Sequence, residues 1–228
     1  MKYLITVFIT LISIQLLSAQ ESVENKELDS LYVEDQIYFS ITYNILGNKL
    51  LGVKQNGFSG GYHLGFIKDI PINKKRNVAL GIGLGISSNS FNQNLQISEV
   101  NNEFRFNVLS TGDFDKNRFS MYQFEVPFEF RWRTSTAETY NFWRIYIGFK
   151  LGYVFSSKTK FVSSSVMNKV NIQDAINKFQ YGLTISIGYD SWNLHLYYAL
   201  NTIFQDQMLE NESIDLNTIK AGLIFYIL

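Results

Sequence analysis

Apolar and polar residues alternate with a period of two along most of the chain after residue 36. Because successive side chains of a β-strand point to opposite faces, this alternation predicts strands with one apolar and one polar face. Eight segments show the pattern, at residues 37–45, 58–66, 78–86, 122–132, 143–155, 179–189, 193–200 and 218–227. Most are about 9 to 12 residues long, which is the length that a tilted strand needs to cross a bilayer.

The direction of the alternation decides between a soluble and a membrane-embedded barrel. A lipocalin-like soluble barrel would also have eight strands, but its apolar faces would point inward. Here the apolar faces carry almost no charge, and the polar faces carry many glycines. These are Gly61, Gly65, Gly81, Gly83, Gly85, Gly148, Gly152, Gly182 and Gly188. A narrow interior needs small residues, and a charge at the bilayer midplane costs roughly 2 to 4 kcal/mol. We therefore predict an all-β fold, an eight-stranded antiparallel up-and-down transmembrane β-barrel whose apolar faces meet lipid.

The N-terminus has the features of a signal peptide. Lys2 precedes an apolar run over residues 3–17, which is followed by the small residues of a cleavage site ending at Ala19. A membrane anchor is the alternative, but the run is shorter than the roughly 20 residues of a spanning helix. The chain has no cysteine, which excludes a lipid-anchored lipoprotein and a disulfide framework. We expect a cleaved signal peptide at 1–19, a periplasmic leader at 20–35 and the barrel at 36–228, in the outer membrane of a Gram-negative bacterium.

The connections between the segments alternate between long and short. Long connections cover residues 46–57, 87–118, 156–178 and 201–213, and short ones cover 68–77, 133–141 and 190–191. Outer-membrane barrels have long external loops and short periplasmic turns. The longest connection shows further alternation at residues 104–108, so we expect it to extend the hairpin of the third and fourth segments above the membrane.

Aromatic residues cluster near the ends of the segments that lead into the short connections. They are Trp132, Phe142, Trp143, Tyr189 and Trp192. This placement predicts an interfacial girdle at the periplasmic rim. The alternative is ordinary packing of aromatic side chains in a core.

Five charged residues form the main polar constellation of the predicted lumen. They are Glu125, Glu129, Arg131, Arg144 and Lys150. In a hairpin of the fourth and fifth segments, one register pairs Glu125 with Lys150, and a two-residue slip pairs Glu129 with Arg144. The structural interpretation is an ion-pair plug, because an eight-stranded barrel is just wide enough to be filled by side chains. The functional interpretation is a gated ion path. We favour the plug, since buried charges must be paired to be tolerated.

The sequence predicts neither a catalytic site nor a metal or cofactor site. His63 and His195, the only histidines, are both predicted to face the lumen, without a readable Ser–His–acid arrangement or metal-ligand spacing. Pro127 is expected to mark a bulge, because a sheet ladder cannot use its missing N–H. The 20 acidic and 20 basic side chains balance, so nucleic acid is not an expected partner.

Three stretches resemble the porin-like or PorT-like outer-membrane barrel family of the Bacteroidota. They are GFIKDIPINKKRNVALGIGLG, VPFEFRWRTSTAETYNFWRIYIGFKLGYVF and FQYGLTISIGYDSWNLHLYYALN. The resemblance covers most of the chain after the leader and implies an outer-membrane barrel. The family's eponymous member is implicated in type IX secretion and gliding. The C-terminal residues IKAGLIFYIL resemble the signal that the barrel-assembly machinery reads.

Three functions compete at this point. The leading hypothesis is a non-enzymatic barrel that contacts outer-membrane lipid and, through its loops and rims, other envelope components such as those of type IX secretion. The second is a narrow porin-type channel for small solutes or ions, motivated by the charged lumen. The third is an outer-membrane lipid-modifying enzyme.

Overall fold

Eight long strands form the main body of the protein in the computed structural model, which describes residues 35–101, 103–110, 112–134 and 142–227. The strands are β1 (Gln36–Gly47), β2 (Gly60–Pro71), β3 (Val78–Asn92), β6 (Lys116–Arg133), β7 (Trp143–Val162), β9 (Phe179–Tyr189), β10 (Trp192–Ala199) and β13 (Asn217–Ile227). The predicted signal peptide and nearly all of the predicted leader lie outside the described residues. Within the described part of the chain, no helix has the length and apolar character to cross a membrane.

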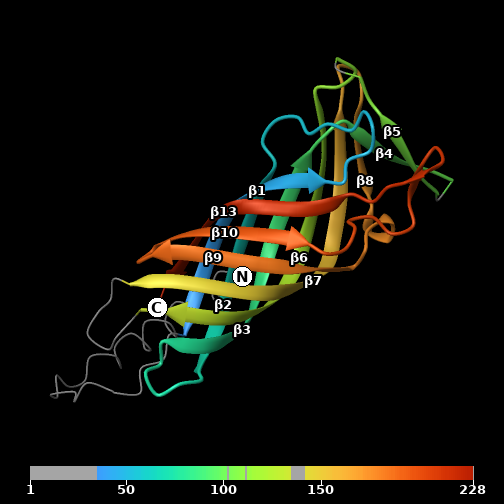
Figure 1. The fold of residues 1–228 in the computed structure, drawn as a ribbon. Helices are drawn as coiled ribbons and strands as arrows, with labels where there is room; N and C mark the ends of the chain where they lie inside the picture. Colours follow the sequence, from blue (N-terminus) through green and yellow to red (C-terminus); the bar gives the residue numbers. More distant parts are fainter. Residues whose placement is uncertain (1–34, 102, 111, 135–141, 228) are drawn as a thin grey trace, which may run out of the picture. The chain divides into compact units, whose positions relative to one another are not determined.

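The eight strands close into a barrel (Figure 1). Every neighbouring pair is antiparallel, in the order β6-β3-β2-β1-β13-β10-β9-β7, and the pairing of β6 with β7 completes the circle. The first strand β1 pairs with the last strand β13 from Ile37↔Ile227 to Gly47↔Asn217. Each of the eight described barrel strands therefore has a neighbour on both sides, as a membrane-spanning sheet requires. The prediction of an eight-stranded antiparallel barrel is confirmed.

The alternation of side chains around the barrel follows the predicted direction. On β1, Phe39 and Ile41 are exposed, whereas Ser40 and Thr42 each have an exposed fraction of only 1%. The same order holds on β3, where Leu84 is exposed and Ser87 is buried. The polar faces therefore fill the lumen, and the apolar faces form the outer surface.

Several strands extend beyond their predicted ends. β2 starts two residues later than predicted and continues to Pro71, because its inward alternation runs on through Ile67 and Asp69. β6 begins at Lys116, six residues before the predicted start, and β7 continues to Val162. The connection that we expected at 68–77 is consequently a turn of residues 72–77 only.

The expected bulge at Pro127 is wrong. Pro127 pairs in regular register with Lys150 of β7, and the register shift between β6 and β7 lies at Tyr122 and Gln123, where the register skips Phe155. On its other side Pro127 lies where the ladder with β3 is interrupted, between the pairs Ile82↔Phe128 and Gly85↔Glu125. The missing N–H of proline therefore interrupts one ladder without adding a residue to it.

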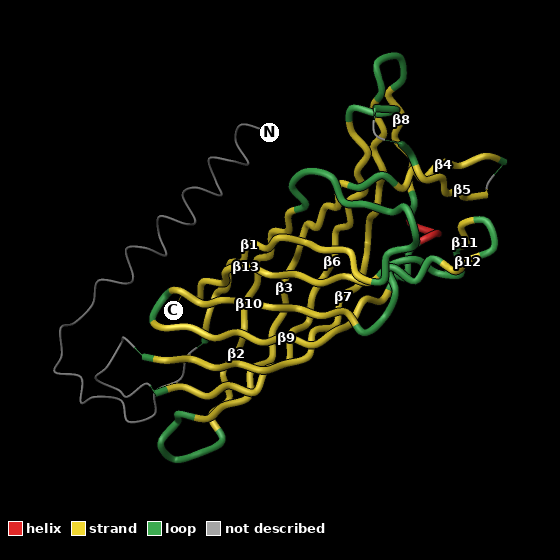
Figure 2. Tube along the Cα trace, turned by 45° about the horizontal axis from the view of Figure 1, so that its top comes forward, coloured by secondary structure: helices red, strands yellow, loops and turns green. Residues whose placement is uncertain are grey.

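The long connections fold together at one end of the barrel (Figure 2). They contain β4 (Leu95–Val100) paired with β5 (Glu103–Val108), β8 (Met167–Asn171) paired with β7, the short helix η1 (Gln173–Ala175), and β11 (Met208–Leu209) paired with β12 (Glu212–Ser213). We call the described residues of 48–59, 93–115, 163–178 and 200–216 the head. Residues 104–108, which we expected to extend the hairpin of the third and fourth segments, instead belong to the separate pair β4–β5, and the hairpin is extended by β3 and β6 themselves, as far as Asn92↔Arg118.

The head has an apolar core that continues into the adjacent end of the barrel. It includes buried residues from loops and strand ends, namely Leu46, Val53, Phe91, Leu95, Ile97, Phe119, Met121, Val154, Ile172, Ala175, Ile176, Ile203, Phe204, Ile214 and Leu216. The rings of Phe91 and Phe119 stack with centroids 4.7 Å apart, and Phe204 lies 5.7 Å from Phe119. The long loops are thus ordered by hydrophobic packing across the mouth of the barrel.

Four of the five aromatics assigned to a rim are exposed at the strand ends opposite the head. They are Trp132, Trp143, Tyr189 and Trp192. The assignment of Phe142 to this girdle is wrong, because Phe142 is buried and the guanidinium carbon of Arg144 lies 4.3 Å from its ring centroid. A cation packed on its face makes this ring part of the interior.

Candidate functional site

The end of the lumen opposite the head holds a cluster of fully buried ion pairs. Asp69 of β2 accepts hydrogen bonds from two arginines of β6, Arg131 at 2.9 Å and Arg133 at 2.9 and 2.8 Å. Arg131 also donates from Nε to Glu129 at 3.1 Å and from Nη2 to Gln36 at 2.5 Å. We call these five residues the end cluster. Its two carboxylates and two guanidinium groups balance, which makes their burial tolerable.

Aromatic rings pack around the end cluster. The guanidinium carbon of Arg131 lies 4.4 Å from the ring centroid of Tyr146 and 5.6 Å from that of Tyr226. The two rings meet edge to face at 5.3 Å. Cation–π contacts of this kind add attraction where water is excluded. The end cluster is therefore both neutralised and sterically enclosed.

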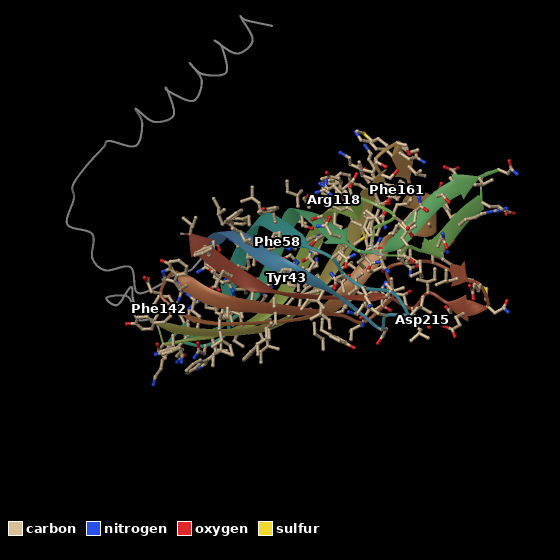
Figure 3. The ribbon with its side chains drawn as sticks, turned by 90° about the horizontal axis from the view of Figure 1, so that it is seen from above. Tyr43, Phe58, Arg118, Phe142, Phe161 and Asp215 are labelled. Carbon is tan, nitrogen blue, oxygen red and sulfur yellow. The ribbon has the colours of Figure 1, made fainter. Side chains whose placement is uncertain are left out.

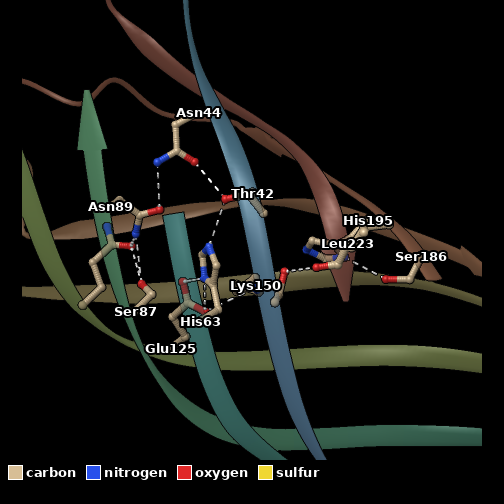
Figure 4. A network of polar contacts seen from close by, with 12 residues as sticks. Thr42, Asn44, His63, Ser87, Asn89, Glu125, Lys150, Ser186, His195 and Leu223 are labelled. Carbon is tan, nitrogen blue, oxygen red and sulfur yellow. Dashed lines mark hydrogen bonds and ion pairs between the residues drawn. The ribbon is translucent and has the colours of Figure 1, made fainter. Parts of the chain in front are cut away.

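A second cluster lies in the middle of the barrel (Figure 4). Nδ1 of His63 on β2 lies 3.0 Å from Oε1 of Glu125 on β6, and Nζ of Lys150 on β7 lies 3.3 Å from Oε2 of the same carboxylate. The Thr42 hydroxyl lies 3.4 Å from Nε2 of His63. We call these four residues the central cluster. The carboxylate joins β2, β6 and β7, and Thr42 adds β1 through its contact with His63.

The central cluster contains a hydroxyl, an imidazole and a carboxylate in the order known from nucleophilic hydrolases. Thr42 also donates to the side-chain oxygen of Asn44 at 2.9 Å, so its hydrogen already has an acceptor. His63 and Thr42 have exposed fractions of 2% and 1%. The group is embedded in the packed lumen, and its contacts serve to satisfy buried polar atoms.

A cavity of about 10 Å³ lies beside the central cluster, between it and the head. It is lined by Gln123, Glu125, Lys150, Gly152, Gln180, Tyr197 and Lys220. That volume corresponds to about one water molecule. At this level the interior is filled by side chains.

Inward glycines make room for these side chains. A methyl group placed on Gly85 would collide with the Tyr38 hydroxyl, and one placed on Gly182 would come within 2.8 Å of the Tyr197 ring. Tyr38 and Tyr197 therefore lie over inward positions of nearby strands that have no side chain. This explains why so many glycines face inward.

All five charged residues singled out from the sequence lie inside the barrel, but neither of the two expected registers forms. Glu125 lies opposite Gly152, and Glu129 lies opposite Gly148. The Glu125–Lys150 ion pair forms diagonally, since Gly152 leaves the space opposite Glu125 empty for the lysine side chain. The expected pairing of Glu129 with Arg144 is wrong.

Glu129 instead pairs with Arg131, two residues further along the same strand, at 3.1 Å. Arg144 lies opposite Arg133 in the ladder and donates to the backbone carbonyl of Asp190. Arg144 therefore contacts the two-residue turn after β9. Its guanidinium group packs on the ring of Phe142 at the same place. The sequence prediction treated the five charges as one network, whereas the structure divides them between two clusters and this turn.

Sequence reasoning missed Asp69 and Arg133 as parts of the interior, and it left His63 and Lys220 out of the charge network. Asp69 and Arg133 fell in predicted loops, although the alternation of inward residues continues through both positions. Lys220 of β13 has its Nζ 4.9 Å from the ring centroid of Tyr197 and lines the small cavity. Following each alternation past its last apolar residue would have found the first two. Among the described residues, no group of three or more His, Cys, Asp or Glu side chains is suited to hold a metal ion.

The head carries a second candidate site. A cavity of about 440 Å³ lies between the turn at Leu50 and Leu51, residues Asn107 and Val108 at the end of β5, and the β11–β12 hairpin from Leu209 to Glu212. Ligand pockets in proteins commonly measure about 300 to 1,000 Å³. Two of its lining residues, Glu210 and Glu212, are acidic, so the cavity combines apolar side chains with negative charge.

Comparison with known proteins identifies the family. The family model described as an outer membrane protein beta-barrel domain matches residues 18–205. The chain belongs to this family. Membership places the barrel in the outer membrane, in agreement with its apolar outer surface. A comparison with curated proteins gives no match.

Two solved structures are similar to this outer-membrane barrel. Both are crystal structures of Ail, the attachment invasion locus protein of Yersinia pestis, one of them in complex with the heparin analogue sucrose octasulfate. They share 16% and 14% sequence identity with it, at TM-scores of 0.33 and 0.31. Each comparison covers 84% of this chain and 99% of the Ail chain.

Proposed function

We propose that this protein is a non-enzymatic and non-conducting outer-membrane barrel that anchors its head, and that the head binds other components of the cell envelope. The observation that carries the proposal is the packing of the lumen. The central cluster and the end cluster fill it at two levels, and the cavity beside the central cluster has the volume of about one water molecule. Function is therefore assigned to the surfaces outside the lumen.

The construction of the head supports this assignment. Loops that serve only to connect strands are commonly mobile, whereas these loops share a core of buried apolar residues with the barrel mouth. The cavity bounded by Val108 and Glu212 offers a concave surface on this ordered scaffold. In outer-membrane barrels the long loops face outside and the short turns face the periplasm, and on this ground we assign the head to the cell exterior.

A narrower version of the proposal concerns type IX secretion. The sequence resemblance to the PorT-like family supports it and suggests components of that apparatus as partners. Deletion of the gene followed by measurement of secreted cargo tests this version. We expect reduced secretion, and unchanged secretion would remove it while leaving the head-binding proposal in place.

The channel and the enzyme are less well supported. A channel would need a continuous water path past two clusters of paired charges. A lipid-modifying enzyme would need its nucleophile at the lipid surface, whereas Thr42 and His63 are buried within the lumen. Mass spectra of lipid A from a deletion strain should be unchanged, and an altered acyl pattern would contradict the proposed lack of enzymatic activity.

The decisive experiment compares charge reversal at the two ends of the barrel. Glu210→Lys/Glu212→Lys alters the head cavity, and Lys74→Glu/Lys75→Glu alters the exposed β2–β3 turn at the opposite end. Both change two charges on exposed residues. After cross-linking in intact envelopes and purification, we expect the head variant to lose the co-purifying envelope components and the turn variant to retain them. Identical recovery with both variants would contradict a partner-binding role of the head cavity.

A further inference from the structure

Five basic side chains lie close together at the head end of the barrel, where β6, β7 and β8 form one sheet. In the ladders, Arg118 of β6 lies opposite Lys160 of β7, and Lys160 lies opposite Lys169 of β8. Lys158 is two residues from Lys160 along β7, and Lys116 is two residues from Arg118 along β6. We call these five residues the basic patch. Figure 3 labels Arg118 beside Phe161, the residue that follows Lys160.

The basic patch lacks compensating acidic partners. Among the described residues, none of its five members takes part in an ion pair. In the ladders, the patch borders Asn92 of β3 next to Arg118, and Ser120 and Asn171 on either side of Lys158. Like charges that face each other across a ladder destabilise a sheet. An anionic counterpart from outside the described chain would therefore stabilise this arrangement.

The bulge between β6 and β7 directs the patch outward. On the side of the bulge away from the head, even-numbered residues of β7 such as Lys150 and Val154 point into the barrel. The register skips Phe155, and above this point Lys158 and Lys160 face outward while Ser157 and Thr159 are buried. A bulge re-aims the side chains that follow it. Without this extra residue the two lysines would point toward the interior.

The height of the patch matches the headgroup layer of a membrane. On β6, all outward residues from Tyr122 to Trp132 are apolar or aromatic. At about 3.3 Å per residue and a tilt of about 40°, this stretch spans about 25 Å, the height of the apolar band of outer-membrane barrels. By the same measure Lys158 lies about 5 Å above the Tyr122 level, and Arg118 and Lys160 lie about 10 Å above it. The headgroup layer adds about 5 to 8 Å per leaflet, within reach of a lysine side chain.

We propose that the basic patch binds the phosphate groups of anionic outer-leaflet lipid. The patch continues the lipid-facing surface of β6 and β7, directly above the aromatic contact of Phe124 with Phe155 at 4.7 Å. Lysine and arginine near an anionic membrane surface are attracted to it, and guanidinium groups bind phosphate well. Lipid is favoured over a soluble polyanion because the patch lies on this outward face. The proposal rests on the orientation given above, with the head end of the barrel at the outer leaflet, and does not depend on the head having a protein partner.

The test uses the folded full-length mature protein and phosphorylated lipid A as the probe. Native mass spectrometry from detergent micelles measures lipid A binding to the wild type, to Lys158→Gln/Lys160→Gln, and to Lys74→Gln/Lys75→Gln as the charge-matched control. At roughly 1 kcal/mol per basic residue, we expect the patch variant to bind about 10- to 30-fold more weakly and the control to bind as wild type. An equal loss in both variants, or no loss in either, would overturn the proposal.

Further measurements distinguish the source of the phosphate and provide a test if the double variant does not fold. Lipid A without phosphates and free inorganic phosphate should each bind the wild type far more weakly than the phosphorylated lipid. If a soluble sulfated polysaccharide binds the patch as tightly as lipid A in neutral nanodiscs, the partner is a polyanion and the proposal fails. If the double variant does not fold, Lys160→Gln and Lys169→Gln alone should each weaken binding several-fold, and unchanged binding would count against the patch.

Discussion

Asp69 of β2 forms a bidentate ion pair with Arg133 of β6. Nη1 of the arginine lies 2.9 Å from Oδ1 of the aspartate, and Nη2 lies 2.8 Å from Oδ2. Both side chains are fully buried, and Oδ1 also accepts from Arg131 at 2.9 Å. The two strands are not neighbours in the barrel, since β3 lies between them. One carboxylate therefore joins β2 to β6 over the intervening strand β3, as part of the end cluster that fills this end of the lumen.

Removing the charge of Asp69 should destabilise the barrel strongly. After Asp69→Asn, the end cluster holds two buried guanidinium groups and only one carboxylate, that of Glu129, which pairs with Arg131. Breaking a buried pair in this way costs about 3 to 5 kcal/mol. Urea unfolding of the protein in lipid vesicles measures the change.

The control is Lys68→Gln, the adjacent residue on the outer side of the same strand. Lys68 pairs with Asp35 at 3.2 Å, and both side chains are partly exposed to solvent. Exposed pairs contribute about 0 to 1 kcal/mol, so this substitution should have little effect. Equal losses from the two substitutions would contradict the structural importance of the end cluster.

The cost of a lysine on the outer face should depend on its depth in the membrane. Phe128 lies near the middle of the apolar stretch of β6, and Tyr122 lies at its upper end; both are exposed on the outside. Phe128→Lys should cost about 2 to 4 kcal/mol and Tyr122→Lys about 0 to 1 kcal/mol. Free energies of unfolding in vesicles check the difference. Equal costs would mean that Tyr122 does not mark the membrane boundary, and would remove the height argument for the basic patch.

The packing of Tyr38 over Gly85 predicts a coupled pair of substitutions. Gly85→Ala places a methyl group against the Tyr38 hydroxyl and should destabilise by about 1 to 3 kcal/mol. Tyr38→Phe removes that hydroxyl, which has no hydrogen-bond partner among the described residues, and should be nearly neutral alone. In the double variant part of the loss should be recovered, because the Leu64 carbonyl oxygen still lies 2.8 Å from the new methyl group. Additive effects in this double-mutant cycle would contradict the contact.

The aromatic core of the head predicts a local effect. Phe119→Ala removes a ring that contacts both Phe91 and Phe204, and should destabilise the packing of the loops by about 3 to 5 kcal/mol. Hydrogen exchange should then rise in residues 200–216 and in β4, with the strands in the membrane unaffected. Leu51→Ala is the control, because Leu51 is 97% exposed. Exchange that rises equally throughout the barrel would contradict a separately packed head.

The barrel could be predicted from the sequence because its physics is local. A strand with one face in lipid must alternate, and the alternation of residues such as Phe39 with Ser40 and Leu80 with Gly81 reports it directly. Closure and strand number followed from eight such segments. The assignment of the polar faces to the lumen and the apolar faces to lipid followed from the glycines on the polar faces, because glycine is rare on exposed strands and fits a narrow lumen.

The interior contacts could not be predicted because they depend on register and on side-chain reach. The skipped residue Phe155 has no marker in the sequence, yet it shifts the register between β6 and β7. Lys150 reaches Glu125 diagonally only because Gly152 is opposite the glutamate. Asp69 was hidden because it follows the last strongly apolar stretch of β2 and resembles the start of a polar turn. The apolar core of the head was missed because Phe91, Leu95 and Ile97 are separated by polar residues and come from a loop-like segment.

The closed lumen is tested most directly by single-channel recording in planar bilayers. The purified full-length protein, shown to be folded, is reconstituted beside a known open porin as the positive control. We expect no conductance steps from this protein at any holding potential, while the porin conducts under the same conditions. Stable, repeated conductance steps that disappear when the protein is omitted would contradict a lumen sealed by the end cluster and the central cluster.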